Sequence, residues 1–241
     1  MDRLAAPLGA ARRADRVLAA ALGQRLRLGY IGGVETRRAE ALSASPRMFD
    51  SDLLDRLSRV HPAVPLVIFV PAIAILFEAG AAAFSTAELA GLVVAGYFFW
   101  TLTEYWMHRL VFHFEPEEGF GARIHWIIHG VHHDHPNDPM RLVMPPSVSV
   151  PLALGFYGLF AFVMGATAAH VFSAAFLAGY LVYDMTHYHV HHHKPRTRAG
   201  KLLRELHMRH HFQDDTRGFG VSAPFWDWVF GTRPLRRTAI R

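Results

Sequence analysis

The sequence predicts an all-α integral membrane protein in which four transmembrane helices form two hairpins beneath a cytosolic helical cap, and this cap holds a histidine-rich di-metal site. Three observations lead to this fold class. Hydrophobic residues make up 51% of the 241 residues and charged residues only 19%, an unusual balance for a soluble domain. Four apolar runs are long enough to cross a bilayer. Of the 17 histidines, all except His61 and His170 gather in clusters outside these runs, and the chain contains no cysteine.

The N-terminal residues 1–45 are rich in Ala and Arg and show little sign of a packed domain. Their basic residues continue through Arg38 without the uninterrupted apolar run of a signal peptide. We expect a basic arm here, either disordered or lying on the membrane surface as an amphipathic segment. A single membrane domain is expected over 46–241.

The four apolar runs cover 64–84, 88–107, 148–165 and 168–185. A helix of about 20 residues crosses the roughly 30 Å of hydrocarbon in a bilayer. The first two runs are joined near Ser85 and Thr86, and the last two between Gly165 and Thr167, so each pair is expected to form a helical hairpin. For the third and fourth runs, which are short, a buried core helix is the alternative.

The basic residues fix the expected orientation. Every Lys and Arg lies in one of three segments, 1–63, 108–147 and 186–241. Two hairpins with uncharged tips place all three segments on one side of the membrane, and the excess of positive charge makes that side cytoplasmic. Both termini and the histidine clusters are therefore expected in the cytoplasm, at a bacterial inner membrane or, in a eukaryote, at the endoplasmic reticulum.

The histidines recur at spacings that suit metal binding. In the pattern H-x-x-H-H the first histidine shares a helix face with those three and four positions later, so three imidazoles can converge on one ion. Two such sets occur, and two further pairs stand at spacings of four and five. The candidate metal ligands are His108, His113, His129, His132, His133, His187, His191, His207, His210 and His211. Ten ligands are too many for one ion and suit two, and imidazole favours Fe, Zn, Cu or Ni over Mg or Ca.

Other polar residues near the clusters have weaker assignments. A disordered, metal-binding histidine tract is the alternative for the clusters as a whole, although they lie among residues typical of ordered structure. Asp184 and Glu104 precede cluster histidines and could orient them by hydrogen bonding, or could be ordinary carboxylates at a helix end. The remaining histidines near the clusters are expected outside the direct ligand set: His125, His135, His189, His192 and His193.

Several stretches together resemble the fatty acid 2-hydroxylases of the fatty acid hydroxylase and sterol desaturase superfamily. They are EYWMHRLVFH, HGVHHDHPND with RLVMPP after it, GYLVYDMTHYHVHH, and ELHMRHHF followed by GFGVSAPFWDWVFGT. The resemblance covers roughly 45–233. It is specific in combination, whereas H-x-x-H-H alone would also fit acyl desaturases and alkane hydroxylases.

The resemblance implies O2-dependent hydroxylation at carbon 2 of a fatty acyl chain, free or in a sphingolipid of the ceramide type. It implies two iron ions, with zinc able to occupy the same site, held by the ten histidines above. If the substrate is a lipid, Tyr183 and Asp184 are candidate catalytic residues, and together with Arg141 they are candidate contacts for the lipid head group or for the metal ligands. Membrane lipids are expected partners, and nucleic acid is not.

The resemblance also bears on the source of electrons. Eukaryotic relatives commonly carry an N-terminal haem-binding cytochrome domain, whereas residues 1–45 are short and contain no histidine. A separate electron donor of cytochrome or ferredoxin type, with its reductase, is therefore expected.

Two alternatives to this function remain open at this point. One is a desaturase or hydroxylase that acts at another position of a lipid, sterol or carotenoid. The other, from a different class, is a membrane metal transporter or metal sensor. Transporters usually place ionisable ligands near the middle of the membrane, whereas these clusters flank the apolar runs.

Overall fold

The computed structural model describes residues 35–116 and 118–235, and all regular secondary structure within these ranges is helical. The described residues divide between Ala44 and Ser45 into two units. The first unit contributes a short helix over 35–42. The predicted arm or surface helix falls largely on 1–34, which lies outside the described residues. The second unit contains the remaining elements.

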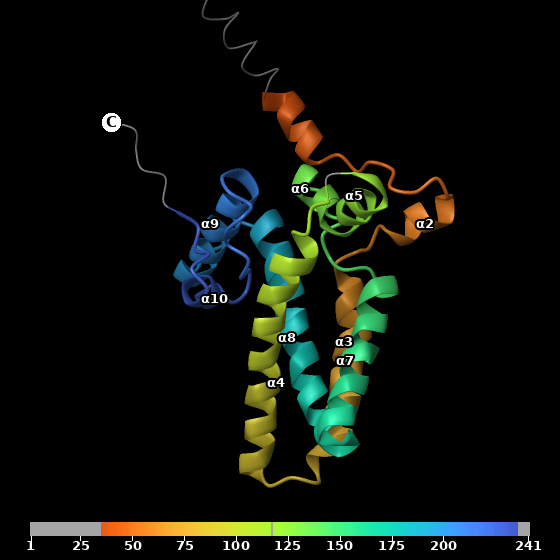
Figure 1. The fold of residues 1–241 in the computed structure, drawn as a ribbon, viewed down its shortest axis with the longest axis vertical. Helices are drawn as coiled ribbons and strands as arrows, with labels where there is room; N and C mark the ends of the chain where they lie inside the picture. The colour runs from red at the N-terminus through yellow and green to blue at the C-terminus, as the bar shows by residue number, and fades with distance from the viewer. Residues whose placement is uncertain (1–34, 117, 236–241) are drawn as a thin grey trace, which may run out of the picture. The chain divides into compact units, whose positions relative to one another are not determined.

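Four helices of the second unit are long and apolar enough to cross a membrane: α3 (Ala63–Ala81), α4 (Thr86–Met107), α7 (Pro146–Met164) and α8 (Ala166–His192). They lie side by side, and the two connections within the pairs α3–α4 and α7–α8 lie at the same end (Figure 1). The prediction of four spanning helices in two hairpins is confirmed.

Both hairpin tips have the local chemistry that ends one helix and starts the next. Ser85 begins α4 with a capping box, in which its hydroxyl accepts the Glu88 N–H at 3.4 Å and the Glu88 carboxylate accepts the Ser85 N–H at 2.9 Å. Gly165 links α7 to α8 with a φ of 80°, a left-handed conformation that glycine adopts without steric cost. Both residues fall at the predicted junctions.

Helix α8 is the central helix of the bundle. Of its most apolar 18-residue stretch, 67% is buried, compared with 11–17% for the other three helices. Glycines let α4 approach it closely, because a Cβ at Gly96 would lie 2.4 Å from the carbonyl oxygen of Phe172, and one at Gly179 would lie 2.7 Å from the Trp100 side chain. The fourth apolar run is thus both a candidate span and the core helix.

Helix α8 also continues past its predicted end at residue 185 as far as His192. The prediction was wrong because hydropathy marks where a run stops being apolar, whereas the helix continues as long as its side chains find partners. His187, Val190 and His191 are buried in this extension. The third histidine pair therefore stands on the end of a membrane helix, where that helix enters the cap.

The shorter elements gather at the end of the bundle opposite the hairpin tips (Figure 1). They are α2 (Asp52–Leu57), the π-helix η1 (His108–Phe112), α5 (Gly119–His125), the π-helix η2 (Trp126–Gly130), α6 (Val131–Asp134), α9 (Arg198–Phe212) and α10 (Phe225–Val229). Together with the ends of α4 and α8 they form the cap, and all ten candidate ligands lie in it.

Candidate metal centre

The first histidine pair lies where α4 changes into a π-helix. The N–H of His113 donates to the carbonyl oxygen of His108 at 3.1 Å, an i to i+5 hydrogen bond. Such a turn brings residues five apart onto one face, and the two imidazole centroids are 5.0 Å apart. The π-turn therefore explains how two histidines five positions apart can face the same site.

The other three sets also stand on helices. His129 lies near the end of the π-helix η2, and His132 and His133 lie on α6, which follows it directly. His187 and His191 occupy the last turns of α8. The set at 207–211 lies on α9.

The ten imidazoles come together in two groups, and in each group the five possible ligand nitrogens lie within 4.8 Å of one another. The first group consists of His108, His113, His129, His133 and His210. The second consists of His132, His187, His191, His207 and His211. Each group could hold one metal ion.

The division of each H-x-x-H-H set between the two groups was not predicted. The sequence suggested that all three histidines of a set face one ion, whereas His129 and His133 belong to the first group and His132 to the second. In the other set, His207 and His211 share a group and His210 joins the opposite one. The reason is helical geometry, because positions i+3 and i+4 point roughly 100° apart around the axis. Each H-x-x-H-H set therefore contributes histidines to both groups.

The distances between ring nitrogens fit a shared cation. In the first group the Nε2 atoms of His108 and His129 are 3.2 Å apart, and those of His133 and His129 are 3.0 Å apart. In the second, the Nε2 of His207 lies 2.8 Å from that of His191 and 3.1 Å from that of His211. An ion with metal–nitrogen bonds of about 2.0–2.1 Å would separate neighbouring ligands by roughly 2.8–3.4 Å.

Hydrogen bonding alone explains these contacts poorly. A ring nitrogen carries either a proton or a lone pair, so the Nε2 of His207 cannot donate to one neighbour and accept from another. The Nε2 of His187 is buried and has no hydrogen-bond partner among the described residues. Lone pairs that converge on a common ion account for both observations, so the residues present fit two bound metals.

Burial keeps the imidazoles of the cap in the neutral form that metals bind. Desolvation, reinforced by neighbouring imidazoles, lowers the pKa of His113 to about 3. The same causes lower the pKa values of His129, His132, His207 and His211 well below the usual value. Ligand nitrogens must be deprotonated before they coordinate, so this environment favours metal binding near neutral pH.

Backbone carbonyls orient two ligands of the first group. The Nδ1–H of His108 donates to the carbonyl oxygen of Phe219 at 2.7 Å, and that of His210 donates to the carbonyl of Arg217 at 2.8 Å. Each bond fixes the tautomer and leaves the Nε2 lone pair free for an ion. Sequence reasoning did not identify these two positions, since any residue type can supply a carbonyl.

Two buried carboxylates hold the segment that supplies these carbonyls. Asp227 accepts the N–H groups of Phe219 and Gly220, both at 2.9 Å, and the Thr232 hydroxyl at 2.8 Å. Glu104 accepts the Ser222 N–H at 2.7 Å and also the Ser222 hydroxyl. Glu104 therefore acts through the 217–223 segment and does not bond His108 directly, as the sequence had suggested it could.

The two predicted catalytic residues lie beside the second group. The ring of Tyr183 stacks against that of His187, with centroids 5.8 Å apart. Asp184 is buried and accepts a hydrogen bond from the Tyr180 hydroxyl at 3.3 Å. The five histidines expected outside the ligand set, His125, His135, His189, His192 and His193, belong to neither group.

A cavity of about 410 Å³ opens beside both groups. Its wall contains His129 from the first group and His132 and His187 from the second, together with Tyr183 and Asp184. Most of the remaining wall is apolar, and part of it comes from α2 and from the start of α7. The volume falls in the range of small-molecule sites, about 300–1,000 Å³.

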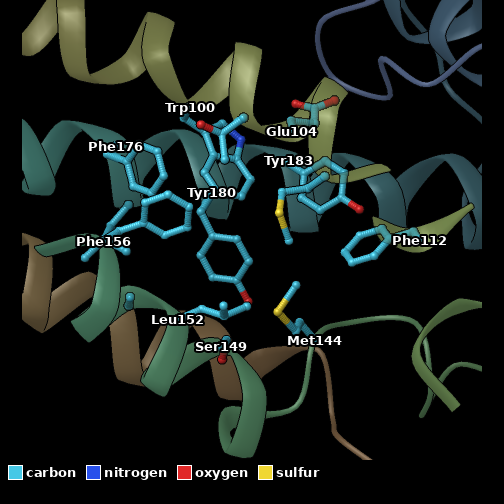
Figure 2. Close-up of a pocket in the computed structure, with 14 residues that line it drawn as sticks. Trp100, Glu104, Phe112, Met144, Ser149, Leu152, Phe156, Phe176, Tyr180 and Tyr183 are labelled. Carbon is cyan, nitrogen blue, oxygen red and sulfur yellow. The ribbon is translucent and has the colours of Figure 1, made fainter. Parts of the chain in front are cut away.

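A smaller cavity of about 40 Å³ leads from this site into the helical bundle. Figure 2 shows Phe112, Met144 and Tyr183 at one end of it, and the same three residues also line the larger cavity. At the other end stand Phe156 and Phe176, whose ring centroids are 4.9 Å apart (Figure 2). The two cavities together run from the histidine groups toward the apolar interior between α4, α7 and α8.

Comparisons with known proteins converge on one family. The family model for fatty acid hydroxylases matches residues 93–232. Two dihydroceramide fatty acyl 2-hydroxylases of Arabidopsis thaliana are 36% and 37% identical to this chain over 198 residues, covering 82% and 81% of it and 84% and 83% of their own length. The fatty acid 2-hydroxylase of Homo sapiens is 35% identical over 212 residues, which is 77% of this chain and 56% of the human protein.

A solved structure is similar as well. It is that of full-length scs7p with only the hydroxylase domain visible, and it matches with a TM-score of 0.72 at 34% sequence identity. The match covers 77% of this chain and 73% of that one.

Proposed function

Because the chain belongs to the fatty acid hydroxylase family, we propose that it hydroxylates carbon 2 of a fatty acyl chain, free or in a lipid of the ceramide type. The observation that carries this proposal is the apolar cavity whose wall contains histidines from both groups. A lipid tail suits such a wall, and the adjoining cavity extends the apolar path into the bundle. The acyl carbon to be oxidised would then lie beside the histidines.

The ten histidines would hold two metal ions, with iron as the active metal and zinc able to take its place. These ions would supply the activation of O2 and the attack on an unactivated C–H bond, which no amino-acid side chain performs. One oxygen atom would enter the product and the other would leave as water, so each turnover needs two electrons and two protons. We therefore propose a partner electron donor of cytochrome or ferredoxin type.

The protein's own residues have three tasks in this reaction. The buried imidazoles bind the ions through neutral nitrogens, and the carbonyls of Arg217 and Phe219 keep two of them in the correct tautomer. The apolar cavity wall excludes water from the acyl chain. Tyr183 and Asp184, on the wall next to His187, would contact the polar end of the lipid.

We further propose that the cap faces the cytoplasm. The tips of both hairpins lie opposite the cap (Figure 1), and no Lys or Arg occurs between Arg59 and Arg109 or between Arg141 and Lys194. All the basic residues thus lie outside the hairpins, and an excess of positive charge in short flanking segments marks the cytoplasmic side.

Lipid analysis of a host with and without the gene tests the proposed reaction. We expect 2-hydroxyacyl lipids only when the gene is present, and none from a His132→Ala variant that still enters the membrane. His193→Ala is the matched control, because His193 is exposed and lies outside both groups. Hydroxyl groups found only at other positions, or full activity in a variant shown to lack metal, would refute the proposal.

A further inference from the structure

Arg141 is a buried cation in the wall of the larger cavity. Its side chain is only 3% exposed. It follows α6 in the chain, and it shares the cavity wall with His132 and His187 of the second histidine group. Among the described residues that line this wall, Arg141 is the one arginine or lysine, and most of the others are apolar.

The guanidinium group of Arg141 is only partly satisfied. Its Nη2 donates to Asp55 at 3.0 Å, and its Nε lies 3.8 Å from the nearer carboxylate oxygen of Asp138, too far for a hydrogen bond. Neither Nε nor Nη1 has a hydrogen-bond partner within the described ranges. Buried donors left without partners are costly and rare in folded proteins, so these free N–H groups need an acceptor.

The surrounding charges indicate what kind of acceptor is needed. Asp55 pairs with both Arg141 and Arg59, and Asp138 stands next to Arg141. Two carboxylates thus face two guanidinium groups, and their charges sum to zero. An added free carboxylate would leave an unbalanced negative charge in a buried place, whereas a neutral carbonyl oxygen would satisfy the free donors without changing the balance.

We infer that Arg141 anchors the substrate by donating to the carbonyl oxygen of a neutral acyl group, an amide or ester, and so selects carbon 2. This inference rests on the proposed function. The methylene groups of an acyl tail are chemically alike, so an apolar wall cannot tell one from the next. Carbon 2 is bonded to the carbonyl carbon, and a fixed carbonyl oxygen therefore determines which carbon faces the histidine groups.

The test compares Arg141→Gln and Arg141→Lys with Arg59→Gln, in the full-length protein with an N-acyl amide lipid as substrate. Arg59 is the matched control because it pairs with the same Asp55 but does not line the cavity. For both Arg141 variants we expect KM to rise about tenfold or more, since a hydrogen bond to a charged donor is lost or weakened. We also expect hydroxyl groups at carbon 3 and beyond, detected by mass spectrometry.

A merely structural role would not move the position of the hydroxyl group. Variants of Arg141 that hydroxylate only carbon 2 with an unchanged KM would overturn the inference. An Arg59→Gln variant whose products carry the hydroxyl group at carbon 3 and beyond as often as those of the Arg141 variants would overturn it too. Arg141→Lys keeps the positive charge beside Asp55 and Asp138. If the glutamine variant fails to fold, the lysine variant still tests the inference.

An independent measurement uses the unaltered protein and a thioamide analogue of the same lipid. Sulfur is the weaker acceptor, so we expect a KM several-fold higher than for the amide, and equal values would contradict the anchor. A protein that forms no 2-hydroxy product from any acyl lipid would instead refute the proposed function, so the two failures are distinguishable.

Discussion

Replacing Asp227 with alanine should lower the metal occupancy of the first histidine group and leave that of the second unchanged. The Asp227 carboxylate accepts two backbone N–H groups, those of Phe219 and Gly220, and the Thr232 hydroxyl. Each buried N–H left without a partner costs about 1–3 kcal/mol, so the two backbone groups alone destabilise the 217–223 segment by about 2–6 kcal/mol. The carbonyl of Phe219, which fixes the His108 tautomer, belongs to this segment.

The loss should be selective because the segment orients ligands of one group only. His108 and His210 both belong to the first group, and they bond to Phe219 and Arg217. Loss of such an orienting partner typically lowers metal affinity about 10- to 100-fold. We therefore expect the metal content per protein, measured by mass spectrometry of the purified and dialysed protein, to fall from two ions toward one.

Two variants serve as controls for this experiment. Asp227→Asn keeps one acceptor oxygen and should retain more metal than the alanine variant. Asp215→Ala removes an exposed aspartate that lies between α9 and the 217–223 segment, and it should retain both ions. The reasoning is refuted if Asp227→Ala keeps both ions, or if a folded variant loses both to the same extent.

Three further predictions concern the packing of the helical bundle, the protonation of the imidazoles and the two cavities. Gly96→Ala should destabilise the protein by about 1–3 kcal/mol, because the added Cβ overpacks against α8. Gly91→Ala is the control, because nothing lies within 4 Å of its added Cβ, and this variant should be neutral or slightly stabilising. Thermal unfolding of both variants measures the difference. In the folded, metal-free protein His113 has a pKa of about 3, whereas in the unfolded chain it takes up a proton below about pH 6.5. Protons therefore favour the unfolded chain, and the unfolding temperature of the metal-free protein should fall as the pH drops from about 7 to 5. A constant unfolding temperature over that range would argue against neutral imidazoles. Leu152→Trp should shift the preferred substrate to shorter acyl chains by narrowing the passage where the two cavities meet, because Leu152 lines both. Leu159→Trp, which changes an exposed residue of the same helix, should leave the preference unchanged. Equal chain-length profiles for the two variants would contradict the proposal that the acyl tail enters the smaller cavity.

Much of the fold could be predicted because the membrane imposes simple rules on sequence. The apolar runs gave four spanning helices, and Ser85 and Gly165 marked the two tips where the structure places them. The end of α8 was missed because His187 and His191 are polar in a hydropathy profile yet buried in the cap. The resemblance to fatty acid 2-hydroxylases, based on the histidine motifs and on GFGVSAPFWDWVFGT, is confirmed by the family match.

The ten ligand candidates were identified because histidine spacing reports helix faces, and all ten meet in the cap. How the ten histidines divide between the two groups depends on how the helices pack against one another. The spacing of residues within one helix carries no information about that packing. The orienting partners were harder still to predict. Glu104 looked like a direct partner of His108 from its position one turn earlier, yet it binds Ser222, far along the chain, and the backbone of Phe219 takes that role.

The central claim is that two groups of five imidazoles each hold one ion, and anomalous X-ray scattering from crystals of the metal-loaded protein tests it most directly. We predict two peaks at the edge of the bound metal, each about 2.0–2.2 Å from nitrogens of a single group. The first peak should contact His129 and the second His132, although these residues are neighbours on one helical stretch. A single peak, no peak, or an ion that binds both of these histidines would contradict the account.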